Sequence, residues 1–275
     1  MTNPERIAKG LYWDRAWTLV RGCTPVSEGC DNCWSAKETH MRQNNPNLKI
    51  QLSNMGLTES GKFNGKIRTV EANLDLLSRT KNPKVWAVWN DLFHEDVSFD
   101  FVCDVLARVE FSPQHTVLVL TKRPERMLEF FQTWENRRWP LPNLWLGVTA
   151  ENQACADERI PILLQIPAAV RFVSVEPMLG AVDLNERELL IDKRRFKYTI
   201  GNYLDWVICG GETGPGARSM QIEWVQNLKD QCVVAGVPFF LKQMHMGGKM
   251  VKMPELDGMV WDEMPEPGRG GDHDA

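Results

Sequence analysis

Short apolar runs recur along the chain, and each stops abruptly at polar or glycine residues before a segment with helical spacing. Runs that are apolar at nearly every position are typical of strands buried on both faces of a parallel sheet. We find seven, at residues 16–22, 85–91, 115–123, 144–152, 170–177, 204–212 and 237–243. Helical spacing predicts helices at 98–112, 124–139 and 222–236. Strands that alternate with helices predict βα units and a parallel sheet.

Polar residues follow the carboxyl ends of most of these predicted strands. They include Arg21, Asn90, Asp91, Lys122, Arg123, Thr149, Glu151, Asn152, Glu176, Gly210, Gly211, Glu212, Lys242 and Gln243. A (β/α) barrel builds its site from the ends of many strands, whereas a doubly wound sheet gathers such residues at one crevice. We therefore expect an α/β fold whose parallel strands form a partial TIM-like (β/α) barrel.

The strand–helix rhythm predicts a single barrel domain over residues 1–263. Two segments interrupt the rhythm. Residues 41–66 are rich in Asn, Gly and Ser and should form an excursion over one end, and residues 181–203 contain a charged insert. Residues 264–275 are polar and rich in Gly and Pro, so we expect a disordered tail.

Composition narrows the class of protein. The net charge is −4 and 43% of the residues are hydrophobic, as in an ordinary globular protein without a global basic field for nucleic acid. No apolar run approaches the roughly 18 residues that a membrane span needs, and the first residues lack an apolar signal core. We expect a cytoplasmic protein that does not associate with membranes.

Candidate chemistry centres on the segment RGCTPVSEGCDNCW, residues 21–34, which holds three of the seven cysteines. Cys23, Cys30 and Cys33 follow the first predicted strand with C-x6-C-x2-C spacing. In a reducing compartment they should be thiols or metal ligands. The other cysteines stand singly among mostly apolar neighbours and are expected in the core; they are Cys103, Cys155, Cys209 and Cys232.

Zinc, an iron–sulfur cluster and plain thiols are the open interpretations of the triplet. A closed zinc site needs four ligands, and His40 is the nearby candidate for the fourth. A deaminase-type zinc would require an H-x-E or C-x-E motif before P-C-x-x-C, which the sequence lacks. A [4Fe–4S] cluster on three cysteines leaves one iron open to S-adenosylmethionine, the arrangement of radical S-adenosylmethionine chemistry. Ligand count and placement favour the cluster.

Seven motifs in order resemble the phage Gp37/Gp68-like family, a domain family of unknown function also called DUF5131. They are GCTPVSEGCDNCW (22–34), DLFHEDV (91–97), LTKRPERM (120–127), GVTAENQ (147–153), SVEPMLG (174–180), DWVICGGETGPGAR (205–218) and FFLKQ (239–243). The resemblance spans most of residues 13–243. It implies a radical S-adenosylmethionine-like barrel of phage or bacterial origin, which would act in the host cytoplasm if a phage encodes it.

The resemblance and the strand-end positions together suggest cofactor-binding residues. Asn90, Asp91 and Glu95 are expected to receive the methionine amino group, and Asp91 is also placed to cap a helix. Ribose and adenosine contacts, or contacts to the substrate side, are expected from Thr149, Glu151, Asn152, Gly210, Gly211 and Glu212.

Candidate catalytic residues are Lys122, Arg123 and Glu176. The two cations could clamp a carboxylate or a phosphate, or could instead pair with acids of the rim. Glu176 is a candidate contact to substrate or ribose.

The expected function is that of a radical S-adenosylmethionine enzyme. Its substrate would be a small molecule, a nucleotide or a DNA base, for instance one rearranged during hypermodification of phage DNA by an isomerase-like or transferase-like reaction. Flavodoxin or ferredoxin would donate the electron. Two alternatives are a zinc-dependent hydrolase or deaminase, and a non-catalytic metal-binding partner protein.

Overall fold

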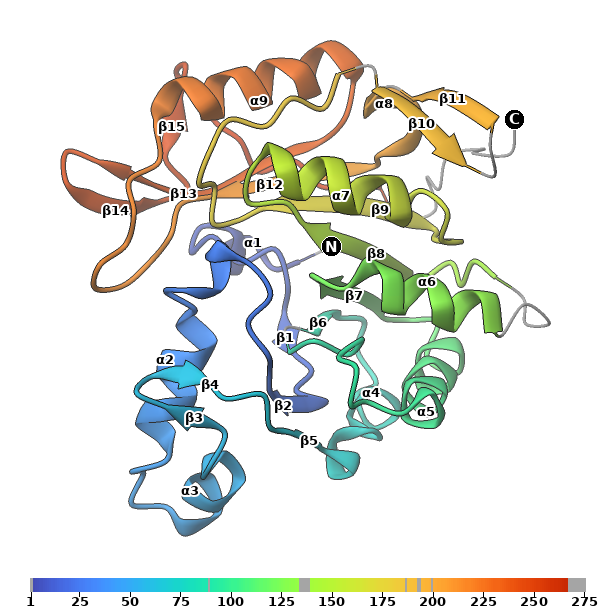
Figure 1. The fold of residues 1–275 in the computed structure, drawn as a ribbon, viewed down its shortest axis with the longest axis vertical. Helices are drawn as coiled ribbons and strands as arrows, with labels where there is room; N and C mark the ends of the chain where they lie inside the picture. Colours follow the sequence, from blue (N-terminus) through green and yellow to red (C-terminus); the bar gives the residue numbers. More distant parts are fainter. Residues whose placement is uncertain are drawn as a thin grey trace.

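The computed structural model describes residues 2–88, 90–133, 139–185, 187–191, 194–198 and 200–266. Its main element is an eight-stranded sheet that curls into a half-barrel (Figure 1). The strands, in their order across the sheet, are β1 (Arg15–Ala16), β6 (Val85–Val88), β7 (Thr116–Thr121), β8 (Leu144–Thr149), β9 (Val170–Val175), β12 (Trp206–Gly210), β13 (Phe239–Met246) and β14 (Lys249–Lys252). From β1 to β13 neighbours are parallel, and β14 is antiparallel to β13. The expected α/β class with mostly parallel strands is confirmed.

Both faces of the sheet are buried, which explains the nearly continuous apolar runs. On β7, Val117 and Val119 belong to one core cluster and Leu118 belongs to a second cluster. Successive side chains of a strand point to opposite faces, so a strand between two cores needs apolar residues at every position. The second cluster is largely aromatic and consists of Tyr12, Val85, Leu118, Trp145, Val170, Phe172, Trp206, Ile208 and Phe240.

Helices lie along the outer side of the curled sheet (Figure 1). They are α5 (Phe99–Glu110), α6 (Pro124–Thr133), α7 (Gln153–Leu163) and α9 (Ile222–Ala235). Ser98 begins α5, because its hydroxyl accepts a hydrogen bond from the backbone N–H of Phe101. Gly236 ends α9 with a φ of 67°, a left-handed conformation that glycine adopts without strain. The helices predicted at 98–112 and 222–236 are confirmed, and residues 134–138 of the third lie outside the described residues.

The prediction of one strand over residues 16–22 is wrong. The chain pairs with β6 only at β1, and β2 (Val20–Gly22) pairs antiparallel with β5 (Ile67–Thr69) outside the main sheet. Between the two strands, the fully buried Trp17 donates from Nε1 to the carbonyl of Asn73 at 2.8 Å. This buried indole fixes the point at which the chain leaves the sheet and carries the cysteines away from it.

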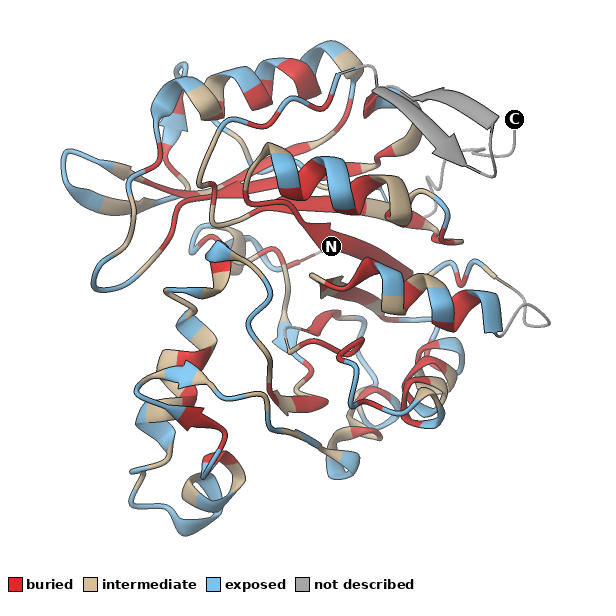
Figure 2. Cartoon of the chain, in the orientation of Figure 1, coloured by how far each residue is buried: buried red, intermediate tan, exposed pale blue. Residues whose placement is uncertain are grey.

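Residues 34–69, which we call the lobe, extend from one side of the half-barrel (Figure 1). Besides β5 the lobe contains α2 (Trp34–Arg42), α3 (Leu48–Asn54), β3 (Thr58–Glu59) and β4 (Lys62–Phe63). Within it, Ala36 and Leu57 are the apolar side chains that are buried. Figure 2 accordingly shows the lobe mostly half-buried or exposed, in contrast to the buried strands of the sheet. The excursion predicted at 41–66 lies within this lobe.

The remaining elements are short. They are α1 (Pro4–Ile7), the 3-10 turns η1 (Glu28–Cys30) and η2 (Glu71–Asn73), α4 (Leu76–Arg79), β10 (Arg187–Ile191), β11 (Arg194–Tyr198), α8 (Ile200–Tyr203), β15 (Glu255–Leu256) and β16 (Met259–Val260). The β10–β11 hairpin falls within the interruption predicted at 181–203. Met264 packs against the aromatic cluster, and residues 267–275 of the predicted tail lie outside the described residues. No helix in the described ranges combines the length and apolarity needed to cross a bilayer.

Candidate functional site

A cavity lies at the carboxyl ends of the parallel strands, bounded on one side by the cysteine segment. It brings together most of the side chains that the sequence singles out. Those in its wall are Cys23, Cys30, Cys33, Asn90, Asp91, Lys122, Arg123, Thr149, Glu176, Gly211 and Glu212. Trp13, Trp34 and Phe63 add aromatic surface to the wall. The strand ends and the loop of residues 23–33 therefore line one cavity.

Other predicted site residues lie just outside this wall: Glu95, Glu151, Asn152 and Gly210. Asn152 is the N-cap of α7, because its Oδ1 accepts from the backbone N–H of Cys155 at 2.9 Å. Its amide nitrogen donates to Glu28 of the cysteine segment at 2.6 Å. Asn152 thus ties the rim to the cysteine segment, a structural role that differs from the expected ribose contact.

The turn η1 and the start of α2 position the second and third cysteines. The backbone N–H of Cys33 donates to the carbonyl of Cys30 at 3.3 Å, and Cys33 is the N-cap residue of α2. Gly29 is required inside this turn, because a Cβ at that position would overlap the carboxylate of Glu151. The C-x2-C end of the motif is therefore a compact turn packed directly on a buried acid.

The three thiols differ in their electrostatic surroundings. Nζ of Lys122 donates to Sγ of Cys30 at 3.6 Å, and the hydroxyl of Ser27 lies 3.9 Å from the same sulfur. Burial raises the pKa of Cys30, but the charge of Lys122 and hydrogen bonds from the loop outweigh burial, so the pKa is lowered. Burial prevails at the other two sites: it raises the pKa of Cys33 and brings the pKa of Cys23 to about 12.

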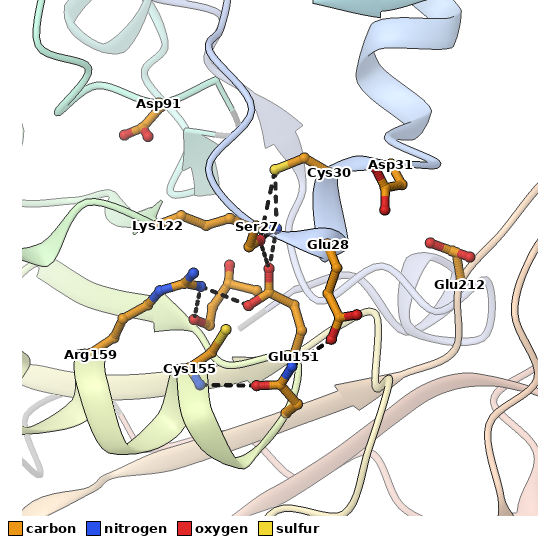
Figure 3. Close-up of polar contacts among 12 residues, drawn as sticks. Ser27, Glu28, Cys30, Asp31, Asp91, Lys122, Glu151, Cys155, Arg159 and Glu212 are labelled. Atoms are coloured by element: carbon orange, nitrogen blue, oxygen red, sulfur yellow. Dashed lines mark hydrogen bonds and ion pairs between the residues drawn. The ribbon is translucent and has the colours of Figure 1, made fainter.

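Glu151 links the loop to the half-barrel from a fully buried position (Figure 3). One carboxylate oxygen, Oε1, accepts hydrogen bonds from Ser27 and Lys122, and the other accepts from Arg159 at 2.7 Å. Burial alone raises the pKa of this carboxyl, but the charges of Lys122 and Arg159 and the hydrogen bonds lower it to about 2. Glu151 is therefore ionised and fully engaged, and is unlike a ribose-binding residue with a free oxygen.

Arg123 is ion-paired within the rim. Its guanidinium donates to Asp91 at 2.5 Å, to Glu95 at 2.7 Å and to the carbonyl of Thr24 at 2.9 Å. A weaker contact reaches Sγ of Cys23 at 3.9 Å. Of the two roles expected for Arg123, these contacts match pairing with rim acids. The ion pairs hold the first cysteine against the loop that follows β6.

Glu212, in the loop after β12, also bonds to the cysteine segment. Its carboxylate accepts from Arg218 at 2.6 Å and from Nδ2 of Asn32 at 2.9 Å. Burial raises the pKa of Glu212, yet the bonds from Arg218 and Asn32 lower it to about 2. Because Asn32 stands between the second and third cysteines, this contact connects the glycine-rich loop after β12 to the cysteine turn.

Glu176, which follows β9, and Lys242, in the middle of β13, form a polar pair in the cavity wall. Nζ of Lys242 donates to Oε1 of Glu176 at 2.6 Å, and Gln243 donates to the same oxygen at 3.1 Å. Among the described residues, Oε2 of Glu176 has no hydrogen-bond partner. Lys242 also lies 5.7 Å from the centre of the Trp13 ring. This pair offers a ligand a carboxylate oxygen and an ammonium group next to an aromatic surface.

The described residues contain no group of three His, Cys, Asp or Glu side chains close enough together to hold one metal ion. His40, the fourth zinc ligand considered above, is engaged inside the lobe, where its Nδ1 lies 3.1 Å from both Thr58 and Gln43. The three thiols line the same cavity without converging on one point.

Two important site residues escaped the sequence analysis. Ser27 bridges Cys30 and Glu151, and Arg159 holds Glu151 from the middle of α7. Ser27 lies inside the motif, where a hydroxyl between two cysteines was a usable signal. Arg159 looks like an ordinary surface residue of a helix, and only the packing of α7 on β8 reveals that it is buried.

Comparison with known families gives one match. The model of DUF5131, described as a protein of unknown function, matches residues 9–265. The chain belongs to this family. No curated protein and no solved structure gives a significant match. The match confirms the DUF5131 part of the family prediction, and it covers the half-barrel, the lobe and every cavity residue named above.

Proposed function

We propose that this protein is a radical S-adenosylmethionine enzyme that binds a [4Fe–4S] cluster through Cys23, Cys30 and Cys33. The observation that carries the proposal is the position of the triplet: three thiols of one short loop line one cavity at the carboxyl ends of a parallel half-barrel. A four-iron cluster needs thiolates that stand apart, because each binds a different iron. When bound, a cluster with one open iron supplies the electron that cleaves S-adenosylmethionine to a 5′-deoxyadenosyl radical.

The residues of the chain would bind and orient the ligands of such a cluster. Asn90 lines the cavity beside the cysteines and is a better candidate for the methionine amino group than Asp91, whose two oxygens are bonded to Thr121 and Arg123. Thr149, at the end of β8, offers a hydroxyl to the bound nucleoside in the cavity floor. The loop and the strand ends that bound the cavity would limit the access of water to a reactive radical.

The substrate would contact the wall formed by Glu176, Lys242 and Trp13. An aromatic face beside a hydrogen-bond donor and an acceptor suits a planar heterocycle such as a nucleobase. This supports modification of a nucleotide or a DNA base, with flavodoxin or ferredoxin as the electron donor. The chemistry of these three side chains, and not the class of fold, supports such a substrate.

The proposal is tested on anaerobically purified protein reconstituted with iron and sulfide and then reduced. Its electron paramagnetic resonance spectrum is recorded with and without S-adenosylmethionine. We expect a [4Fe–4S]⁺ signal that changes when the ligand is added. Absence of a cluster, or a signal indifferent to the ligand, would overturn the proposal, and a single zinc ion per chain would favour a hydrolase or deaminase.

A matched pair of variants separates the site from the other cysteines. Cys30→Ala should abolish cluster binding while circular dichroism shows a folded chain. Cys232→Ala, which removes a fully buried core thiol of α9, should retain the cluster. Unfolding of the chain by Cys30→Ala would indicate a structural metal site and a non-catalytic protein.

A further inference from the structure

Lys122 is held against Cys30 by a chain of buried contacts. Its ammonium donates to Sγ of Cys30, to Oγ of Ser27 at 3.3 Å and to Oε1 of Glu151. A lysine ammonium has three hydrogens. All three have partners in this loop, so Lys122 has no donor left to clamp a substrate carboxylate or phosphate.

Glu151 is itself fixed from behind by Arg159 (Figure 3). Both side chains are buried, and Nη1 of Arg159 donates to Oε2 of Glu151 at 2.7 Å and to the carbonyl of Thr149 at 2.8 Å. Burying an ion pair costs desolvation free energy that the pair alone often fails to recover. A third charged group, Lys122, completes this cluster, and its ammonium is the part that reaches the cavity wall.

The charges around the first and second cysteines have opposite signs. The ion-paired cluster that contacts Cys30 through Lys122 consists of the cations Lys122 and Arg159 and the anion Glu151, and it carries one net positive charge. Beside Cys23, the cation Arg123 is paired with the two anions Asp91 and Glu95, which leaves one net negative charge. A positive field therefore acts on one end of the triplet, at the cysteine whose sulfur also accepts the lysine hydrogen bond.

We propose that Lys122 raises the reduction potential of a cluster bound at Cys30, and that Glu151 and Arg159 are positioning residues that hold the ammonium in place. The inference rests on the proposed function and changes the role of Lys122 from substrate clamp to control of the cluster. Reduction adds one electron to the cluster, and a nearby cation stabilises that added charge most strongly where water is excluded. Hydrogen bonds to cluster sulfurs also set the potential.

The test is a redox titration of the reconstituted protein, followed by the [4Fe–4S]⁺ resonance signal. Lys122→Met should move the midpoint potential to a lower value than that of the wild type. Lys242→Met is the control. Lys242 lines the same cavity, but its ammonium bonds to Glu176 and not to a cysteine, so this variant should leave the midpoint potential nearly unchanged. If Lys122→Met binds no cluster, Lys122→Gln keeps a donor without the charge and is measured in its place.

Arg159→Met tests the positioning role through non-additivity. If Arg159 acts by holding Glu151 and thereby Lys122, its replacement lowers the midpoint in the wild type and changes nothing further in the Lys122→Met background. An equal shift in both backgrounds would mean that Arg159 acts through its own field, and would overturn the positioning role. A purely structural role would change thermal stability without changing the midpoint.

The outcomes distinguish the two proposals. A wild-type protein that forms no cluster would overturn the proposed function and this inference together. A wild-type cluster whose midpoint is the same in Lys122→Met, or shifts equally in Lys242→Met, would overturn the inference alone.

Discussion

The half-barrel and the lobe are stabilised by different interactions. Strands of the half-barrel are buried on both faces between two apolar clusters, whereas the lobe buries two apolar side chains and reaches the loop after β12 through a hydrogen bond from Lys37 to the carbonyl of Pro215. Burial of apolar surface is strong but non-directional, while hydrogen bonds and ion pairs fix orientation. The stability of the scaffold and the placement of the cysteines therefore depend on separate sets of residues.

The largest effect should come from the apolar core of the half-barrel. Trp206 is fully buried in the aromatic cluster, so Trp206→Ala should lower the free energy of unfolding by roughly 3–5 kcal/mol. Leu52→Ala in the lobe, where the side chain is 52% exposed, should change it by less than about 0.5 kcal/mol. Urea unfolding measures the free energy of unfolding of both variants. Similar losses in the two would contradict the contrast between the half-barrel and the lobe.

Acid should weaken the contact between the cysteine segment and the half-barrel, which Glu151 forms with Ser27 and Lys122. The pKa of Glu151 is about 2 in the folded protein and ordinarily 4.5, so an unfolded chain takes up this proton first as the pH falls. Its contribution, roughly 3 kcal/mol, is fully present above the ordinary value and is lost as the pH falls towards 2. Urea unfolding at a series of pH values should give a shallower acid slope for Glu151→Gln than for the wild type. Parallel slopes would show that Glu151 does not titrate in this way.

The cysteine turn packs so closely on Glu151 that a Cβ at Gly29 should destabilise the protein. Gly29→Ala introduces a Cβ that overlaps the Glu151 carboxylate, and should cost roughly 1–3 kcal/mol and reduce cluster occupancy. Gly180→Ala is the matched control, because its Cβ would lie at an ordinary 3.5 Å from Asn152. Thermal unfolding and iron content are measured for both variants. Equal values for Gly29→Ala and Gly180→Ala would show that the turn moves away from Glu151 without cost.

The smallest effect should be a local loosening of the cysteine segment. Asn32→Ala removes the hydrogen bonds to Glu212 and to the carbonyl of Gly216, each worth about 1 kcal/mol. Hydrogen exchange should accelerate in residues 23–33 and stay unchanged in β12. Glu38→Gln, which breaks an exposed ion pair with Arg42, serves as control. Equal acceleration in β12 would mean that loop and sheet open as one unit.

The sheet could be predicted because its signal is local. Six strands of the main sheet are largely buried and therefore read as apolar runs, and each of these runs became a parallel strand: β6, β7, β8, β9, β12 and β13. The exit of the chain at Trp17 could not be predicted, because Trp17 is itself apolar and lies within the apolar run of residues 16–22. β14 escaped notice because its residues Lys249–Lys252 are exposed or half-buried and lack an apolar run.

The residues of the candidate site were predicted in part, because the ends of the strands can also be recognised from the local sequence. Strand-end positions indicated which residues gather in the cavity, because parallel strands end at one edge. Pairing within the cavity depends on contacts between distant segments, such as Lys122 with Glu151 and Arg123 with Asp91. Position in the sequence therefore located these side chains without revealing which of them have donors or acceptors left for a ligand.

The residues that contact the cysteine turn are synthesised much later than the turn itself. Asn32 and its partner Glu212 are 180 residues apart, and Glu28 and Arg218 are 190 residues apart. At synthesis rates of about 5–20 residues per second, the thiols emerge roughly 10–40 s before these partners exist. During translation the triplet thus lacks these contacts, and synthesis of the last third of the chain supplies the partners that hold the loop in place.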